Sequence, residues 1–319
     1  MGATTFPTPH LHLQIRMSVT LVVLAAGRAT RFGSLKQLTP VGPAGEVLLD
    51  FAVFDASQAG CDSVVVVIRS DLQTHFEGWN ARHPGLGGLV RFVHQDAGGS
   101  PESAAPRSAP WGTGHAVLAA ARIVSGPMVV VNADDFYGRA AYDALVRFLR
   151  DPATRDDDAA LIGYRLGDTL SPHGGVSRAV CTVQGGRLTS MTELLDVRAG
   201  PAGITGRLPT GESRRLTGDE TISMNIWGFR PGVLPELAAE FERFRETPAG
   251  LAGPEFRLSD AVHALVERER ISCAVLPSAS AEWFGMTFAP DRERATRRLA
   301  SFLAAGVYPP RLFPDRSWN

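Results

Sequence analysis

An unbroken apolar run that leads straight into a charged, glycine-containing loop constrains this chain more than any other feature of its sequence. All residues from Leu21 to Ala25 are apolar, as in a parallel strand buried on both faces of a sheet, and Gly27 ends the run. Open α/β sheets bind ligands in the loops that follow the carboxyl ends of their strands. The sequence therefore predicts an α/β fold with a ligand-binding loop directly after its first strand.

This loop has the composition of a phosphate-binding site. Its small residues let the backbone approach a ligand closely and turn N–H groups toward an anion, while Arg31 and Lys36 add positive charge. We therefore expect the loop to contact a nucleotide. The residues predicted to do so are Leu24, Ala25, Ala26, Gly27, Ala29 and Thr30.

The two commonest phosphate-binding motifs do not fit this loop. A P-loop requires G-x-x-x-x-G-K-[ST], and a dinucleotide-binding turn requires G-x-G-x-x-G with an acidic residue about 20 positions later. Here Gly27 and Gly33 flank Arg31, and Lys36-Gln37 follows without the Ser or Thr that would hold magnesium. The loop therefore argues against a dinucleotide-dependent oxidoreductase and against a P-loop enzyme.

Composition excludes several classes of partner. The chain has 319 residues, 44% of them hydrophobic, which allows one large α/β domain or two smaller ones, and its formal net charge is −1. That charge gives no reason to expect nucleic acid or an anionic membrane surface as partner, and no apolar run approaches the roughly 18 residues of a membrane span. Cys61, Cys181 and Cys273 lie far apart without a CxxC pair, which favours a reducing cytoplasm.

Alternating helix and strand patterns in the first hundred residues predict a parallel sheet with helices on both faces. Residues 46–59 and 71–80 have helical spacing, and residues 64–68 and 89–94 are expected to be strands. From residue 171 to 218, short alternating segments separated by glycines predict antiparallel hairpins that are inserted at the sheet edge. The expected architecture is a Rossmann-like three-layer sandwich with a mostly parallel sheet and an antiparallel insertion.

The opening loop resembles that of the sugar-1-phosphate nucleotidyltransferases of the glucose-1-phosphate uridylyl and thymidylyl type. In that family the first strand runs into [GA]-G-x-[GA]-[ST]-R followed by Lys, as in Ala26 to Arg31 and Lys36. The related cytidylyltransferases show Lys-Gln at the end of the same loop. The resemblance runs in motif order from about Val19 to about Tyr308, and it implies a nucleotide-diphospho-sugar transferase fold in which a nucleoside triphosphate and a sugar 1-phosphate react.

A second group of polar residues is predicted to bind a metal ion. Asp134 and Asp135 follow a buried strand, and adjacent carboxylates at a strand end suit Mg²⁺, which prefers oxygen ligands. The resemblance implies a metal aspartate here, with Asp134 as the first choice, and a second protein ligand at Asn225. The alternatives are a helix cap for one aspartate and a hydrogen-bonded core amide for Asn225.

Further segments resemble the family's base-reading and sugar-binding motifs. The segment from Gly112 through Thr113 to Ala116 resembles the uridylyltransferase G-T-[GA]-H-A, with Gln95 as the complementary contact, and this favours UTP over dTTP. An ordinary helix entry with Thr113 as N-cap is the alternative. The residues expected to bind the sugar are Gly175, Glu193 and Trp283, and hairpin or core roles are the alternatives for them.

Together these segments predict an in-line nucleotidyl transfer with catalytic roles for Arg31, Lys36 and Asp134. The resemblance implies that Arg31 holds the β and γ phosphates, that Lys36 lies between the α phosphate and the sugar phosphate, and that Mg²⁺ bridges the substrates. Two alternatives remain. One is a cytidylyltransferase-like enzyme acting on another phosphorylated small molecule, and the other is a non-catalytic nucleotide-sugar sensor of the same fold.

The chain is expected to form one nucleotidyltransferase domain over residues 18–310. Its nucleotide-binding half is predicted to span residues 18–168 and its sugar-binding half residues 169–310. Residues 1–17 are expected to be a disordered tail, and residues 311–319 a second tail.

Overall fold

The parallel pairing of three neighbouring strands sets the position of the opening loop. The computed structural model describes residues 17–27, 35–86, 88–95, 111–201, 203–247, 255–278 and 282–313. In it, β1 (Thr20–Leu24) lies between β2 (Ser63–Ile68) and β4 (Met128–Asn132) and is parallel to both. Every residue of β1 is buried, as its apolar composition predicts.

The sheet continues on both sides of these strands. On one side β3 (Val90–His94) pairs in parallel with β2. On the other side β11 (Thr221–Phe229) is antiparallel both to β4 and to β6 (Asp158–Arg165), and β12 (Ser272–Pro277) is parallel to β6. With β8 (Arg187–Gly200), β9 (Gly203–Arg207) and β10 (Ser213–Leu216), the strand order is β10-β9-β8-β12-β6-β11-β4-β1-β2-β3. The predicted α/β class is therefore confirmed, with a mixed sheet in which β11 runs against its neighbours.

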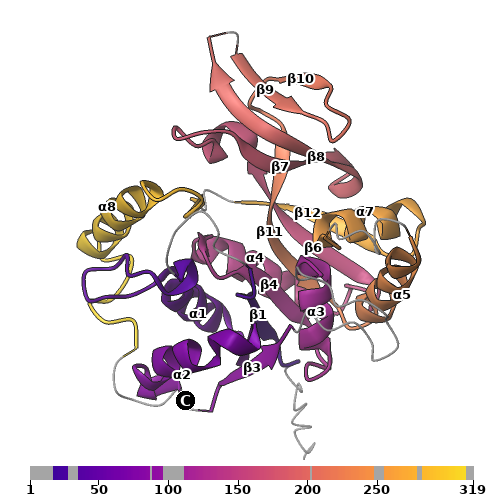
Figure 1. Cartoon of the computed structure of the whole chain (residues 1–319). Coiled ribbons are helices and arrows are strands. Elements are labelled where there is room, and N and C mark those ends of the chain that lie inside the picture. Colours follow the sequence, from indigo (N-terminus) through magenta and orange to yellow (C-terminus); the bar gives the residue numbers. More distant parts are fainter. Residues whose placement is uncertain are drawn as a thin grey trace, which may run out of the picture.

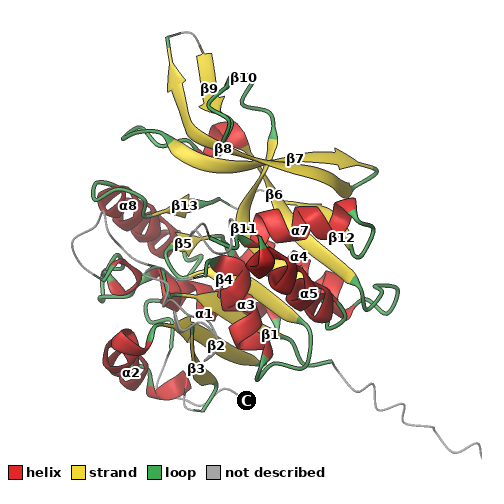
Figure 2. Ribbon diagram, turned by 45° about the vertical axis from the view of Figure 1, so that its right-hand side comes forward, coloured by secondary structure: helices red, strands yellow, loops and turns green. Residues whose placement is uncertain are grey.

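The predicted antiparallel hairpins form an arm that stands away from the main sheet (Figures 1 and 2). Its strands are β7 (Val176–Gln184), β8 (Arg187–Gly200), β9 (Gly203–Arg207) and β10 (Ser213–Leu216). β7 pairs with β8 along most of its length and also with β11, which joins the arm to the main sheet.

Helices cover both faces of the main sheet. Side chains of β1 alternate between two hydrophobic clusters. Leu21 and Val23 pack with α1 (Leu48–Ala59), α2 (Gln73–Ala81) and α4 (Arg139–Arg150), whereas Val22 and Leu24 pack with α3 (Thr113–Ala121), α5 (Val233–Glu246) and α7 (Leu258–Glu267). Within the described residues, no helix combines the length and the apolar composition that crossing a bilayer requires. The helical segments are α1 (Leu48–Ala59), α2 (Gln73–Ala81), α3 (Thr113–Ala121), α4 (Arg139–Arg150), α5 (Val233–Glu246), α7 (Leu258–Glu267), α8 (Asp291–Ala304), η1 (Lys36–Leu38), η2 (Ser70–Leu72), η3 (Pro84–Leu86) and η4 (Leu166–Thr169).

A third hydrophobic cluster fixes a short two-stranded sheet beside the carboxyl end of β4. Strands β5 (Asp135–Phe136) and β13 (Phe284–Gly285) pair with each other, and the rings of Phe136 and Phe284 stack with centroids 4.5 Å apart. Side chains of α8 and α1 pack around these rings. This packing holds Asp135 at the edge of the main sheet.

A buried carboxylate contacts this cluster through Tyr308. Asp55 of α1 accepts a hydrogen bond from the hydroxyl of Tyr308 through Oδ2 (2.8 Å), and its Oδ1 has no partner among the described residues. Burial raises the pKa of Asp55 to about 7, while the hydrogen bond from Tyr308 and the charge of Arg139 oppose this shift. Between about pH 4 and pH 7, the carboxyl of Asp55 is therefore protonated in the folded state. In the unfolded chain, where the pKa of an aspartate is about 3.9, the same carboxyl has lost its proton.

We predict that Asp55→Asn weakens the pH dependence of folding. Because the folded pKa of Asp55 exceeds the unfolded value, this group makes the free energy of unfolding fall as pH rises from about 4 to about 7. Urea denaturation at several pH values measures the effect, with the exposed Glu246→Gln as control. An Asp55→Asn profile that falls as steeply as that of the unmodified chain would contradict the assignment.

Candidate functional site

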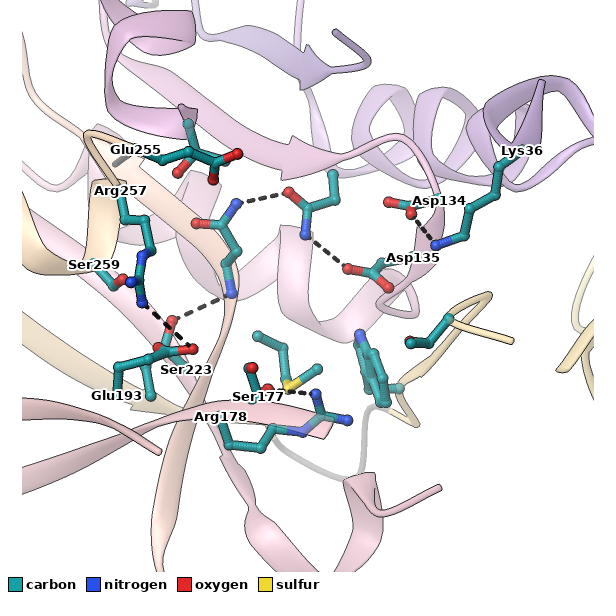
Figure 3. A pocket seen from close by; sticks show the side chains of 17 residues that line it. Lys36, Asp134, Asp135, Ser177, Arg178, Glu193, Ser223, Glu255, Arg257 and Ser259 are labelled. Atoms are coloured by element: carbon teal, nitrogen blue, oxygen red, sulfur yellow. Dashed lines mark hydrogen bonds and ion pairs between the residues drawn. The ribbon is translucent and has the colours of Figure 1, made fainter. Parts of the chain in front are cut away.

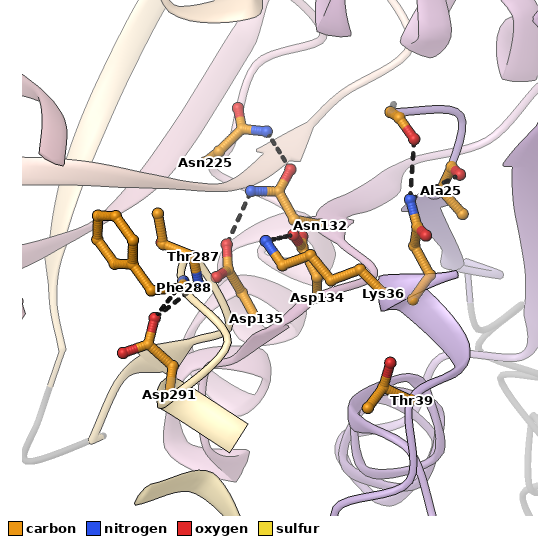
Figure 4. A network of polar contacts seen from close by, with 12 residues as sticks. Ala25, Lys36, Thr39, Asn132, Asp134, Asp135, Asn225, Thr287, Phe288 and Asp291 are labelled. Carbon is orange, nitrogen blue, oxygen red and sulfur yellow. Dashed lines mark hydrogen bonds and ion pairs between the residues drawn. The ribbon is translucent and has the colours of Figure 1, made fainter. Parts of the chain in front are cut away.

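Lys36 and Asp134 meet at the carboxyl edge of the sheet. Lys36 opens η1 after the first loop, Asp134 follows β4, and Lys36 Nζ lies 2.5 Å from Asp134 Oδ2 (Figure 4). Their side chains are 17% and 28% exposed, so a ligand can reach both. The structure thus joins the basic loop to the acidic strand end. Arg31, Ala29 and Thr30 lie outside the described residues.

Two side chains hold the segment that follows β1 in place through hydrogen bonds. Gln37 Nε2 donates hydrogen bonds to the carbonyl oxygens of Gly27 (3.0 Å) and Ala25 (3.4 Å). Arg69 Nη1 donates to the carbonyl oxygens of Ala26 (3.4 Å) and Gly27 (3.5 Å). Gln37 therefore anchors the start of the loop, and Arg69, which no sequence motif indicates, fixes the same segment from the end of β2.

A chain of amides connects the acidic strand end to β11. Asn132 Nδ2 donates to Asp135 Oδ2 (2.8 Å), and the hydroxyl of Tyr137 lies 3.2 Å from the same oxygen. Asn225 Nδ2 donates to Asn132 Oδ1 (2.6 Å), while Asn225 Oδ1 accepts from Trp227 Nε1 (2.8 Å). The amide of Asn225 is therefore hydrogen-bonded at both ends, as its apolar surroundings require.

Asn225 lies on a bulge with an uncommon backbone conformation. Its φ is +61°, and the pairing of β11 with β6 shifts register between Ser223 and Trp227. A non-glycine residue at positive φ costs free energy and is retained where the surrounding structure fixes it, often at a functional position. The bulge places Asn225 among the residues that line one cavity, together with Lys36 and Asp134.

The two adjacent aspartates have different surroundings. Burial, and then the charge of Asp134, raise the pKa of Asp135 to about 7, against the hydrogen bond from Asn132 and the charge of Lys36. Gly285 of β13 lies so close that a Cβ there would collide with the Asp135 carboxylate. The side chain of Asp134 is 28% exposed and lines the cavity, so its carboxylate is accessible to a ligand.

The donor set fits a magnesium ion that keeps most of its water ligands. Asp134 offers carboxylate oxygens to the cavity, and Asn225 Oδ1 retains one lone pair beside its bond from Trp227. Mg²⁺ is usually bound by one or two protein oxygens together with substrate phosphates and water. In the part of the chain that the structure describes, no group of three or more His, Cys, Asp or Glu side chains forms a metal cage.

The predicted base-reading residues lie together beside α3. Gln95 Nε2 donates to the carbonyl oxygen of Gly112 (2.7 Å) and lies 3.4 Å from His115 Nδ1. Thr113 Oγ1 accepts a hydrogen bond from the backbone N–H of Leu258 (2.9 Å), at the start of α7. The alternative in which Thr113 caps its own helix is therefore wrong, because the residue before α3 is Gly112 and Thr113 bonds a different helix.

The arm supplies the opposite wall of the cavity. Burial raises the pKa of Glu193 on β8, and the nearby guanidinium of Arg257, 3.9 Å away, opposes this shift. The ring of Trp283 lies against the guanidinium of Arg178, with 5.1 Å from Cζ to the ring centroid. Gly175 is not part of the wall, and its lack of a side chain is explained by the carboxylate of Asp196, which a Cβ would hit.

The cavity of about 320 Å³ combines predicted and unpredicted residues. Arg178 and Arg257 line the cavity although neither belongs to a motif with a glycine or an acidic pair, whereas Asn132 lies two residues before the acidic pair Asp134-Asp135. In the sequence, the one signal for Arg178 is that a charged residue stands at an inward-facing position of the alternating segment 176–183. The predicted residues that line the cavity are Lys36, Thr113, Asp134, Asp135, Glu193, Asn225 and Trp283.

The first half of the chain matches a known protein family. Residues 21–152, from β1 through α4, match the family described as MobA-like NTP transferase domain. A curated relative, the bifunctional protein GlmU of Hyphomonas neptunium, is 25% identical over an alignment of 300 residues that covers 90% of this chain and 54% of the relative. The chain thus spans about half the length of this relative.

Solved nucleotidyltransferases share the fold. The inositol-1-phosphate CTP transferase of T. maritima aligns over 91% of this chain and 98% of its own, with a TM-score of 0.61 and 12% identity. A putative glucose-1-phosphate thymidylyltransferase of Bacillus anthracis aligns over 88% and 95% (TM-score 0.58, 12% identity). A UDP-glucose pyrophosphorylase aligns over 89% and 99% (TM-score 0.58, 16% identity). The resemblance to nucleotidyltransferases is therefore confirmed.

We predict that Gly112→Ala destabilises the protein, whereas Gly78→Ala does not. Gly112 has a φ of +98°, and a Cβ there would lie 2.7 Å from the carbonyl oxygen of Phe256, so the loss is expected to exceed about 1 kcal/mol. Gly78 lies inside α2 with nothing within 4 Å of an added Cβ, and alanine there is expected to stabilise by about 0.4–1 kcal/mol. Urea denaturation compares the two, and equal effects would contradict the geometry.

Proposed function

We propose that the chain condenses a nucleoside triphosphate with a sugar 1-phosphate to form a nucleotide sugar and pyrophosphate, and the match of residues 21–152 to the MobA-like NTP transferase domain supports this. The ion pair between Lys36 and Asp134 carries this proposal, since it places a cation and a cation ligand at one wall of a cavity. Glu193 and Trp283 line the same cavity from the acceptor side.

The reaction requires little covalent chemistry from the protein. A phosphate oxygen of the sugar phosphate attacks the α phosphorus in line, and the bond from that phosphorus to the bridging oxygen of the β phosphate breaks. The attacking group is already an anion, so no enzyme nucleophile is needed. The site must bring two anions together and neutralise the charge that develops on the leaving pyrophosphate.

Lys36 and Asp134 have different roles in neutralising this charge. We propose that Lys36, which pairs with Asp134 in the structure, contacts the α phosphate and the attacking phosphate, and that Arg31, outside the described residues, contacts the β and γ phosphates. Asp134, with Asn225, would hold Mg²⁺, which when bound supplies positive charge to the phosphate oxygens. Binding of the triphosphate would then compete with Asp134 for Lys36 and open their ion pair.

The nucleotide is proposed to be UTP. The segment from Gly112 through Thr113 lies beside Gln95, whose side-chain amide donates to the carbonyl oxygen of Gly112, and this arrangement supports a base-binding role for these residues. CTP is the alternative, since one solved structure with this fold is an inositol-1-phosphate CTP transferase. Lys36-Gln37 does not decide between them, because Gln37 is used to hold the backbone of the loop.

A catalytic role is favoured over a non-catalytic sensor by the pairing of Lys36 with Asp134. Recognition of a finished nucleotide sugar would not need a lysine and a metal-binding carboxylate at the same point. We further propose a cytoplasmic protein without nucleic-acid or membrane partners, since all three cysteines are free and buried and the net charge is −1.

Removal of either charge should abolish turnover. We expect Lys36→Ala and Asp134→Ala each to lower kcat/KM by at least about a hundredfold, because each removes charge stabilisation made in the transition state. Pyrophosphate release is measured with nucleoside triphosphates, a panel of sugar 1-phosphates and Mg²⁺. Arg82→Ala, at an exposed position on the far end of α2, controls for charge removal alone. Unchanged rates in both site variants would refute the transferase assignment.

Nucleotide preference can be ranked by thermal denaturation. UTP is expected to raise the melting temperature more than dTTP, CTP, ATP or GTP, since a ligand at about 100 times its Kd stabilises by about 2.7 kcal/mol. Gln95→Ala should reduce the shift caused by UTP while leaving the shift caused by pyrophosphate, which has no base. A larger shift with CTP would favour the cytidylyltransferase alternative instead.

A further inference from the structure

Arg178 is a buried cation in the cavity wall that has no ion pair among the described residues. It belongs to β7 and is only 7% exposed, yet its side chain lines the cavity (Figure 3). The other described cations that line the cavity form ion pairs, Lys36 with Asp134 and Arg257 with Glu193. A buried charge without a close counter-charge is costly, so this position requires an explanation.

Three hydrogen bonds and one aromatic ring fix the orientation of the guanidinium. Its Nε donates to Thr169 Oγ1 (3.1 Å), its Nη1 to the carbonyl oxygen of Ser177 (2.8 Å), and its Nη2 to the carbonyl oxygen of Thr169. Trp283 covers one face of the group. One N–H on each terminal nitrogen is left without a partner among the described residues, which is the two-pronged arrangement that binds phosphate or carboxylate.

The surroundings keep this group charged. Burial lowers the pKa of Arg178 to about 10, against the charges of Asp135, Glu193 and Asp291. It therefore stays protonated at neutral pH. Its compensating carboxylates are all beyond ion-pair distance, so an anion that enters the cavity would become its first direct counter-charge.

The position of Arg178 separates it from the nucleotide-side cation. Lys36 approaches from η1, next to β1, whereas Arg178 approaches from the arm, on the opposite wall of the cavity (Figure 3). Glu193, on the neighbouring strand β8, lies on the same wall as Arg178 and can accept hydrogen bonds from hydroxyl groups. The arm side thus offers one anion-binding group and one hydroxyl-binding group.

We propose that Arg178 binds the phosphate of the acceptor, and that the acceptor is a phosphate monoester of a polyhydroxylated compound. This inference rests on the proposed nucleotidyl transfer and adds the residue that selects a phosphorylated acceptor. The planar guanidinium holds two phosphate oxygens and leaves the third free to attack the nucleotide. A neutral sugar would leave Arg178 without a counter-charge and would bind poorly.

Binding measurements on Arg178→Gln and Arg178→Lys test the inference. By calorimetry with hexose 1-phosphates, Arg178→Gln is expected to raise the Kd of the ester about ten- to hundredfold, the loss of a charged hydrogen-bond pair. Arg178→Lys, which keeps the charge, is expected to recover part of this affinity. The Kd of the nucleoside triphosphate should stay within about twofold in both variants, and the exposed Arg155→Gln should change neither constant.

If the role of Arg178 were purely structural, the binding measurements on the variants would give different results. Thr169→Val removes one hydrogen bond of the guanidinium but leaves its charge, so ester binding should be largely retained. Equal losses in Thr169→Val and Arg178→Gln, equal losses for ester and nucleotide, or no ester binding by the unmodified chain would each overturn the inference. If Arg178→Gln does not fold, the comparison of Arg178→Lys with Thr169→Val decides in the same way.

The same proteins separate this inference from the proposed function. Ester binding that depends on Arg178, without pyrophosphate release from any nucleoside triphosphate, would refute the transferase while leaving the phosphate site in place. Pyrophosphate release with an unchanged KM for the ester in Arg178→Gln would instead retain the transferase and reject the role of Arg178.

Discussion

The ion pair between Lys36 and Asp134 is the contact on which the rest of the site depends. Parallel pairing of β1 with β4 brings the carboxyl ends of both strands to one edge, with Leu24 opposite Asn132. The residues that follow each strand are therefore neighbours, although about a hundred positions separate them in sequence. At 2.5 Å the two charges neutralise each other until phosphate groups, which carry more negative charge than one carboxylate, compete for the lysine.

Packing and hydrogen bonding keep this edge in one geometry. The stacked rings of Phe136 and Phe284 hold β5 against β13, and the amides of Asn132 and Asn225 connect β5 to the bulge of β11. Such a network is stable only when each member has its partners, because an unpaired polar group in this environment is costly. The strained backbone of Asn225 is the part of the network that a strand of regular pairing would not contain.

The sequence predicts the strands and the antiparallel arm better than it predicts the residues that line the cavity. Apolar runs and glycine positions locate β1, β2 and the antiparallel arm, although α1 and α2 begin two residues later than helical spacing indicates. Motifs also place Lys36 and Asp134 together, since both follow strands of one sheet. The left-handed backbone of Asn225 and the hydrogen bond of Thr113 to another helix arise from contacts between distant segments, and no local pattern encodes them. For Arg178, the alternating segment at 176–183 indicates an inward position but not the cavity that the side chain lines.

A structure of the protein with a nucleoside triphosphate and Mg²⁺ tests the central claim most directly. We expect Lys36 Nζ to move from Asp134 to the α phosphate. The ion should be bound by Asp134 and Asn225, and the triphosphate should lie at the carboxyl end of β1. A triphosphate bound elsewhere, with the ion pair of Lys36 and Asp134 still intact, would contradict this claim.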